Sequence, residues 1–324
     1  MKILLVPDPT SPNGEDAFCR EIANRAPARG HVCAMRAASA GRADSDVVVV
    51  NGLQAGALLS AAAAGSPTIL RLIDSYVGAP QPALAQAKRL TASASRVLVP
   101  SEYLKGIVSG WGIDAARVRV VPYAYDQIFA QQIMLVTLRA ARPSGFGLVT
   151  SGPVDDVALP AFETVLSAVS RLRLDCHLDV LGDGEALDAL KSRAESLLMG
   201  SRVAFPGDLP HPKKMEYLRA AKAFIEPSGR QGFPSLALHA MSEGCPVVAA
   251  AAGALPELVR DGENGLLYRS GDAGALGEQI VTLASTPGLS LRLIAEGVRT
   301  VGRHSWDATV AAALDAVESV GAPA

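Results

Sequence analysis

The chain has 324 residues, of which 49% are hydrophobic and 19% are charged. This length suits two domains better than one ordinary core, and the composition excludes a disordered, collagen-like or coiled-coil protein. The formal net charge of −2, the aromatic content of 5% and the lack of a concentrated basic stripe exclude an ordinary nucleic-acid-binding protein.

The cysteines and the apolar runs predict a cytoplasmic protein. Cys19, Cys33, Cys176 and Cys245 show no ligand spacing, so we expect neither a disulfide framework nor a zinc site. Every apolar run is shorter than the ~20 residues that span a bilayer. The run at residues 1–6 is also shorter than the apolar core of a signal peptide.

The first part of the chain alternates short apolar strands with helices. Continuous apolar strands separated by helices are typical of a parallel sheet that is covered on both faces. The predicted elements are, in order, strand Ile3–Val6, helix 14–29, strands His31–Met35 and Val47–Val50, a helix through Ala64, strand Thr68–Leu72, helix Pro82–Ser93, strand Val97–Val99, helix Ser101–Ser109 and strand Val118–Val121.

The alternation stops over about residues 123–144 and then restarts. We therefore expect a linker there, followed by a second sheet. The predicted elements are strand Phe146–Thr150, helix Leu159–Arg171, strand His177–Leu181, helix Glu185–Leu198, strand Val203–Phe205, helix Lys213–Ala221, strand Ala223–Glu226, helix Ser235–Glu243, strand Val247–Ala250, helix Leu255–Arg260, strand Gly265–Tyr268, two further helices and a final helix Trp306–Val320.

These elements predict an α/β protein with two Rossmann-like domains, whose parallel sheets face each other across a cleft. We expect an N-terminal domain over residues 1–140 and a second domain over residues 141–305. The helix over about residues 306–324 follows the second sheet, and we expect it to cross back onto the first domain.

Two glycines follow predicted strands at the sheet edge where such folds bind ligands. Gly14 lies between the first strand and the first helix, and Gly182 ends the strand His177–Leu181 in the sequence Gly-Asp-Gly. A glycine there lets the backbone approach a ligand, and the helix that follows offers N–H groups to an anion. A tight turn is the simpler explanation of Gly14, and a turn also suits the Gly-Asp-Gly sequence.

The most informative block is Phe224–Gly265, which alternates strands, glycine-rich loops and helices. It resembles the donor-binding block of the family-4 retaining glycosyltransferases of GT-B fold, which typically reads E-G-F-(G/P)-x-x-x-x-E-A-M-x-x-G-x-P-V-V, then G-x-x-P-E, then D-G-x-N-G. The residues that match in register are Gly232, Phe233, Pro234, Ala240, Met241, Gly244, Pro246, Val247, Val248, Gly253, Pro256, Glu257, Asp261, Gly262, Asn264 and Gly265.

The resemblance covers nearly the whole chain, strongly after residue 175 and loosely before it. It implies transfer of a sugar from a nucleotide-diphosphate sugar to an acceptor held by the first domain, without a metal or another cofactor. The donor would bind along Gly232, Phe233, Pro234 and Ser235, with Gly14 and Gly182 on neighbouring loops.

The chain departs from the family at the paired glutamates, which are replaced by Gln231 and His239. In the family, the first glutamate usually contacts the donor sugar and the second the ribose. Gln231 keeps hydrogen bonds to the sugar but brings no negative charge, and His239 can hold a ribose hydroxyl through a ring nitrogen. A partly buried helix residue explains His239 as well.

The family's Arg and Lys for the donor diphosphate are also replaced. The corresponding stretch, Thr150–Ala158, contains Asp155 and Asp156 and no cation. We therefore expect weaker diphosphate binding than in relatives that keep both cations. Arg230 is a local substitute, although a solvated loop arginine is the simpler interpretation.

The family's His-Asp pair in the acceptor domain becomes Ile73-Asp74, so the resemblance implies Gln231 and Asp74 as the catalytic candidates. These changes leave three hypotheses open. The first is an active glycosyltransferase, the second a non-catalytic scaffold or partner subunit of an active transferase, and the third a sugar-nucleotide epimerase on the same architecture.

The charge is distributed unevenly along the sequence. Residues 1–142 contain 15 basic and 10 acidic residues, whereas residues 143–324 contain 15 and 22. A basic first domain is compatible with an acidic partner or with peripheral contact at the inner face of a membrane, although an ordinary solvated surface is the simpler interpretation.

Overall fold

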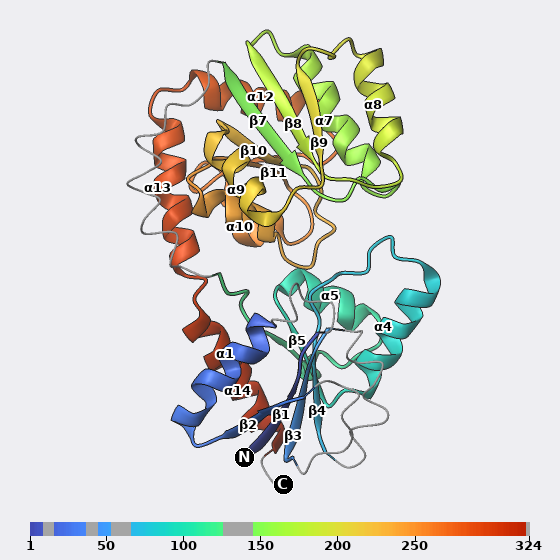
Figure 1. Cartoon of the computed structure of the whole chain (residues 1–324), viewed down its shortest axis with the longest axis vertical. Coiled ribbons are helices and arrows are strands. Elements are labelled where there is room, and N and C mark those ends of the chain that lie inside the picture. Colours follow the sequence, from blue (N-terminus) through green and yellow to red (C-terminus); the bar gives the residue numbers. More distant parts are fainter. Residues whose placement is uncertain (9–15, 37–44, 53–65, 126–144, 322–324) are drawn as a thin grey trace. The chain divides into compact units, whose positions relative to one another are not determined.

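A computed structural model describes residues 1–8, 16–36, 45–52, 66–125 and 145–321. They form two compact units, one made of Met1–Tyr125 with His304–Ala324 and the other of Asp126–Arg303 (Figure 1). Each unit contains a six-stranded sheet whose neighbouring strands are all parallel. The predicted α/β class with two Rossmann-like sheets is confirmed.

The first sheet has the strand order β2-β1-β3-β4-β5-β6. Its strands are β1 (Lys2–Val6), β2 (Val32–Met35), β3 (Val47–Asn51), β4 (Thr68–Arg71), β5 (Arg96–Val99) and β6 (Val118–Val120). The helices and short 3-10 turns of this unit are α1 (Ala17–Arg25), η2 (Ala26–Arg29), α4 (Gln81–Ser93), α5 (Glu102–Gly110), η3 (Ala115–Arg117) and α14 (Trp306–Gly321).

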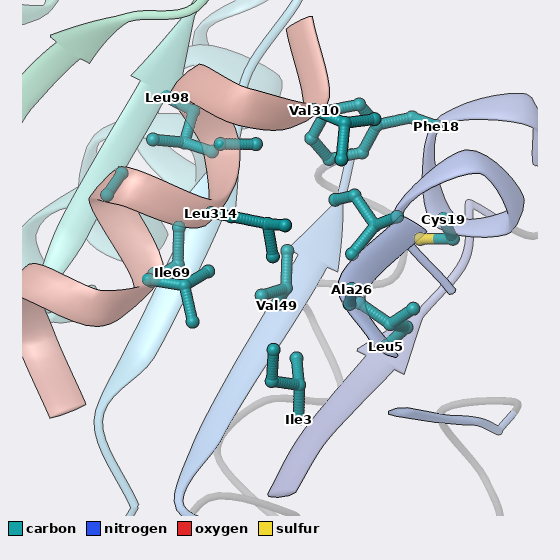
Figure 2. Close-up of a cluster of buried hydrophobic side chains, with 14 of the residues drawn as sticks. Ile3, Leu5, Phe18, Cys19, Ala26, Val49, Ile69, Leu98, Val310 and Leu314 are labelled. Atoms are coloured by element: carbon teal, nitrogen blue, oxygen red, sulfur yellow. The ribbon is translucent and has the colours of Figure 1, made fainter. Parts of the chain in front are cut away.

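Both faces of the first sheet are covered, which explains why β3 is buried at every residue. Helices α4 and α5 pack on one face through residues such as Leu90 and Leu104. Helices α1 and α14 pack on the other face, where Phe18 and Leu314 join the apolar side chains of the strands (Figure 2). The last helix of the chain is therefore part of the first unit's core.

Polar contacts also hold α14 on this unit. Arg25 Nε donates to Asp307 at 2.9 Å, and Arg29 Nη1 donates to Asp315 at 2.6 Å. The buried His31 ring lies 2.9 Å from Glu318. These contacts join α14 to residues that lie up to 289 positions earlier in the sequence.

The second sheet has the strand order β12-β11-β10-β7-β8-β9. Its strands are β7 (Phe146–Ser151), β8 (Cys176–Leu181), β9 (Val203–Gly207), β10 (Ala223–Glu226), β11 (Val247–Ala250) and β12 (Leu266–Tyr268). Its helices are α7 (Leu159–Arg171), α8 (Leu187–Ser196), α9 (His211–Ala220), α10 (Ser235–Ser242), α11 (Leu255–Leu258), α12 (Ala273–Ser285) and α13 (Leu289–Gly302).

Several helices differ from their predicted limits, and for two of them the reason is local. Helix α8 begins at Leu187 because the dihedral angles of Ala186 are not helical, and the Ala186 N–H is donated to the carbonyl of Val154 in another loop. Helix α11 ends at Leu258 because Val259 has extended dihedral angles. The helix predicted to run through Ala64 and most of the predicted linker lie outside the described residues.

None of the helices in the described part of the chain is both long and apolar enough to cross a membrane.

Candidate functional site: the switch point of the second sheet

The strand order of the second sheet creates a place for a ligand. The chain moves from β7 through β8 to β9 on one side, then returns to add β10 on the other side of β7. The loops after β7 and β10 therefore diverge at the carboxyl edge between these two strands. Crevices at such switch points are where open parallel sheets bind ligands.

The loop after β10 leads directly into α10. Gly232, Phe233 and Pro234 are buried, and Ser235 begins the helix half-buried. Ser235 donates its N–H to the carbonyl of Phe233 at 2.9 Å, and no side chain caps the helix. Leu238 donates its N–H to the carbonyl of Pro234 at 3.2 Å, so the N–H groups of Leu236 and Ala237 are the ones that could face an anion. The helix dipole favours negative charge there.

Two glycines that follow strands of this sheet are required because loops touch backbone to backbone. A side chain at Gly253, which has φ +59°, would collide with the carbonyl of Gly229 in the loop after β10. A side chain at Gly182 would collide with the carbonyl of Gly152 in the loop after β7. Gly182 therefore has a packing role, and its contact with a donor stays a prediction.

Arg230 is not the solvated loop residue that the sequence suggested. Its Nη2 donates to Asp155 Oδ2 at 2.5 Å, and the side chains are 23% and 30% exposed respectively. The pair joins the loop after β10 to the loop after β7. Burial alone would raise the pKa of Asp155, but the hydrogen bond from Arg230 and a backbone N–H of the same turn hold it below its ordinary value.

His239, in the position of the family's second glutamate, is a neutral group at physiological pH. Burial and the nearby His211 lower its pKa to about 4. The two rings meet edge to face with centroids 5.1 Å apart. Gln231 is half-buried in the loop before α10. The two positions where the family has carboxylates therefore bring no charge to this edge.

Sequence reasoning missed Glu226, the last residue of β10. Its side chain is 2% exposed, and burial raises its pKa to about 8 although it accepts a hydrogen bond from the backbone of Ser228. The sequence feature that could have identified Glu226 is a single acidic residue at the end of an apolar strand. Glu226 is therefore largely protonated at neutral pH.

Several buried oxygens at this edge have no hydrogen-bond partner among the described residues. They are Glu226 Oε2 and the hydroxyls of Thr150, Ser151 and Tyr268, at the carboxyl ends of β10, β7 and β12. Buried polar groups normally have partners. The edge thus has unused hydrogen-bonding capacity, which a ligand or water would satisfy.

The remaining predicted site residues belong to the first unit or to residues that are not described. Asp74 is exposed after β4, and its Oδ1 accepts a hydrogen bond from the Tyr76 N–H at 3.2 Å. Gly14 lies outside the described residues. The roles assigned to Asp74 and Gly14 therefore stay predictions.

The first unit has its own switch point between β1 and β3, with a buried polar chain that the sequence did not predict. Arg71 donates to Asn51 at 3.0 Å, and Asn51 donates to Asp16 at 2.7 Å. The Arg71 guanidinium also lies 4.1 Å from the Phe18 ring centroid. These contacts fix the start of α1 against the ends of β3 and β4.

Comparison with known proteins relates both units to glycosyltransferases. The family model "Glycosyl transferase 4-like domain" matches residues 13–124, and the model "Glycosyl transferases group 1" matches residues 158–299. The second match contains the loop and helix of the switch point just described.

The curated proteins that are similar to this chain are also named as glycosyltransferases. The D-inositol 3-phosphate glycosyltransferase of Thermomonospora curvata is 30% identical over 253 residues, which cover 71% of this chain and 59% of the relative. The phosphatidyl-myo-inositol mannosyltransferase of Mycobacterium leprae is 31% identical over 147 residues, which cover 45% and 38%. The chain spans about half the length of the curated relatives it matches.

Solved structures share the fold over nearly the whole chain. HepE of Anabaena in complex with UDP and glucose gives a TM-score of 0.78 at 18% identity, with 98% of this chain and 100% of that chain covered. The sucrose-phosphate synthase of Thermosynechococcus elongatus gives 0.73 at 19% identity, with 98% of each chain covered. With a glycosyltransferase model matched in each unit and a two-sheet fold shared with these structures, the chain belongs to the family-4-like glycosyltransferases of GT-B fold.

Proposed function

We propose that the protein transfers a sugar from a nucleoside diphosphate sugar to an acceptor, with retention at the anomeric carbon. The observation that carries the proposal is the uncapped start of α10 at the switch point, within the residues matched by the glycosyltransferase model. HepE, which has this fold, was solved with UDP and glucose and with UDP-glucose, so UDP is the first nucleotide to test.

The donor diphosphate would lie over Gly232, Phe233, Pro234 and Ser235. The Ser235 N–H is taken by Phe233, so the N–H groups of the next residues in α10 and the Ser235 hydroxyl would contact the phosphates. As the glycosidic bond breaks, negative charge develops on the leaving diphosphate. The helix dipole and Arg230 would stabilise that charge without a metal ion.

Gln231 and His239 would hold the rest of the donor. Gln231 can donate and accept hydrogen bonds at the sugar hydroxyls, and neutral His239 has one donor and one acceptor nitrogen for the ribose. Asp74 of the first unit is the candidate group for the acceptor. The relatives named for inositol 3-phosphate and phosphatidyl-myo-inositol make a polyol and its phosphate ester the first acceptors to test.

The first experiment is calorimetry of the full chain with UDP, GDP and ADP, followed by measurement of diphosphate release from the matching nucleotide sugars. We expect one nucleotide to bind. Gln231→Ala should lower kcat/KM about tenfold, the value of one lost hydrogen bond in a polar site. The exposed Gln81→Ala is the matched control and should leave kcat/KM unchanged.

Failure of all three nucleotides to bind would contradict the proposal. The hypothesis of a non-catalytic scaffold or partner subunit would then take precedence, and co-purification with an active transferase would be its test. Tight binding with release of diphosphate but no transfer to any acceptor would instead leave the donor assignment standing and require a wider acceptor panel.

Peripheral contact of the first domain with anionic lipid is a separate prediction, and the structure reduces its electrostatic support. With α14 included, the first unit has 13 basic and 12 acidic residues. Co-sedimentation with anionic and neutral vesicles at low salt tests the contact. Equal recovery with both vesicle types would contradict it.

A further inference from the structure

The ion pair between Arg230 and Asp155 lies beside the loop over which the donor diphosphate is proposed to bind. It connects the two loops that diverge at the switch point of the second sheet. Both side chains are half-buried, so solvent screens the pair less than it screens an ordinary surface pair. Arg230 also immediately precedes Gln231 and the residues proposed to hold the phosphates.

The two partners differ in how firmly the backbone holds them. Asp155 Oδ1 accepts a hydrogen bond from the Ala158 N–H at 2.8 Å. The Asp155 carbonyl accepts from the N–H of Leu159 at 2.9 Å. The carboxylate is therefore fixed in the turn that begins α7, whereas Arg230 reaches it from the end of a long flexible side chain.

The guanidinium is suited to a phosphate as well as to a carboxylate. Arg presents its N–H donors in a planar fork that matches either group, and a diphosphate carries more charge than one carboxylate. While Arg230 is bound to Asp155, the positive charge is neutralised for an incoming anion. Once a phosphate takes Arg230, the Asp155 carboxylate is left beside it as a repulsive charge.

We infer that Asp155 is a built-in competitor that holds Arg230 in the free protein and lowers the affinity for the donor diphosphate. The inference rests on the proposed function, because it concerns the same nucleotide site. It makes Arg230 the phosphate-binding cation and Asp155 the residue that sets the strength of that contact. Asp155 acts through Arg230 and is a positioning residue.

The test is calorimetry of the full chain with UDP at low salt, using charge-matched variants. Asp155→Asn keeps the oxygen that accepts from Ala158 and removes the charge. Asp156→Asn makes the same change at the exposed neighbouring position. We expect Asp155→Asn to tighten UDP binding about tenfold, the effect of one charge-assisted hydrogen bond, and Asp156→Asn to change it less than twofold.

Arg230→Gln completes a double-mutant cycle. Alone it should weaken UDP binding tenfold or more. In its background, Asp155→Asn should tighten UDP binding much less than it does in the parent, because the cation that Asp155 holds is gone and only its repulsion of the phosphate remains. Uridine, which has no phosphate, should bind all variants with equal affinity. That comparison separates a phosphate effect from a general change in the loops.

Three results would overturn the inference. Equal effects of Asp155→Asn and Asp156→Asn would show only a general charge effect. Weaker binding of both UDP and uridine by Asp155→Asn, with a lower melting temperature, would show that the pair only ties the loops together. Absence of binding of UDP, GDP and ADP by the parent and every variant would overturn the proposed function as well.

Discussion

Glu226 makes the stability of the second unit depend on pH. Burial raises its pKa in the folded chain to about 8 from the ordinary 4.5. Between these values the folded protein retains a proton that the unfolded chain has released. The stabilisation is complete below about pH 4.5 and is lost as the pH rises through about 8, with a slope of at most ~1.4 kcal/mol per pH unit.

Glu226→Gln should remove this slope, because an amide keeps the shape and cannot ionise. We expect the variant to exceed the parent in free energy of unfolding by about 1–3 kcal/mol at pH 7, and by less at pH 5. Denaturant unfolding at pH 5, 6, 7 and 8 measures the difference. The exposed Glu195→Gln is the control, and parallel pH profiles of parent and Glu226→Gln would contradict the prediction.

The residues of the candidate site differ in how well the sequence predicts them. The loop around Gly232 and the start of α10 follow from local patterns, since glycine, proline and an apolar helix occur in order. The contact between Arg230 and Asp155 joins residues 75 positions apart. No local pattern predicts such a contact, because the strand order that brings the two loops together is itself a long-range property.

Helix α14 is attached to its unit by apolar burial and by ion pairs, and these differ in strength. Leu314 is 2% exposed in the cluster that contains Phe18 and Val310 (Figure 2). The side chains of Arg29 and Asp315 are 36% and 65% exposed. Solvated pairs contribute ~0–1 kcal/mol, whereas a buried leucine contributes several times more.

Leu314→Ala should therefore destabilise the first unit by about 2–5 kcal/mol, and Arg29→Gln should have a much smaller effect, because solvent screens its ion pair. The midpoint of thermal unfolding, followed by circular dichroism, compares the two variants with the parent. Because two units need not unfold together, the transition assigned to the first unit is the one to follow. A loss for Arg29→Gln as large as that for Leu314→Ala would contradict the prediction.

At the scale of elements, the apolar strands were the most predictable feature, because β3, β4 and β10 are buried on both faces and read as continuous apolar runs. Helix limits were less predictable. Helix α8 begins after Ala186, whose dihedral angles are not helical and whose N–H contacts the carbonyl of Val154 in another loop; helix propensity does not encode such a contact.

For the molecule as a whole, the end of the first segment of the first unit lies beside the start of its second segment. The Tyr125 N–H donates to the carbonyl of His304 at 2.9 Å, and the His304 ring lies 2.9 Å from the carbonyl of Tyr123. The second unit is continuous in sequence between these points, whereas the first is assembled from two separate segments.

Truncation after Arg303 should therefore damage the first unit and spare the second. The truncated chain would expose the apolar sheet face that α14 covers, around Ile69 and Leu98. We expect hydrogen exchange to show lost protection in β1, β3, β4 and β5 and unchanged protection in β7 and β10. Equal loss of protection in both units would contradict this expectation.

The return of α14 also sets an order of events during synthesis. At roughly 5–20 residues per second, a ribosome needs about 10–35 s to make the second unit. Throughout that interval the nascent first unit has its strands but lacks the helix that covers one face of them. The second unit can therefore fold completely before the first unit has its last helix. The segment that is synthesised first completes its fold last. Until then, its uncovered sheet face is the surface to which a chaperone would bind.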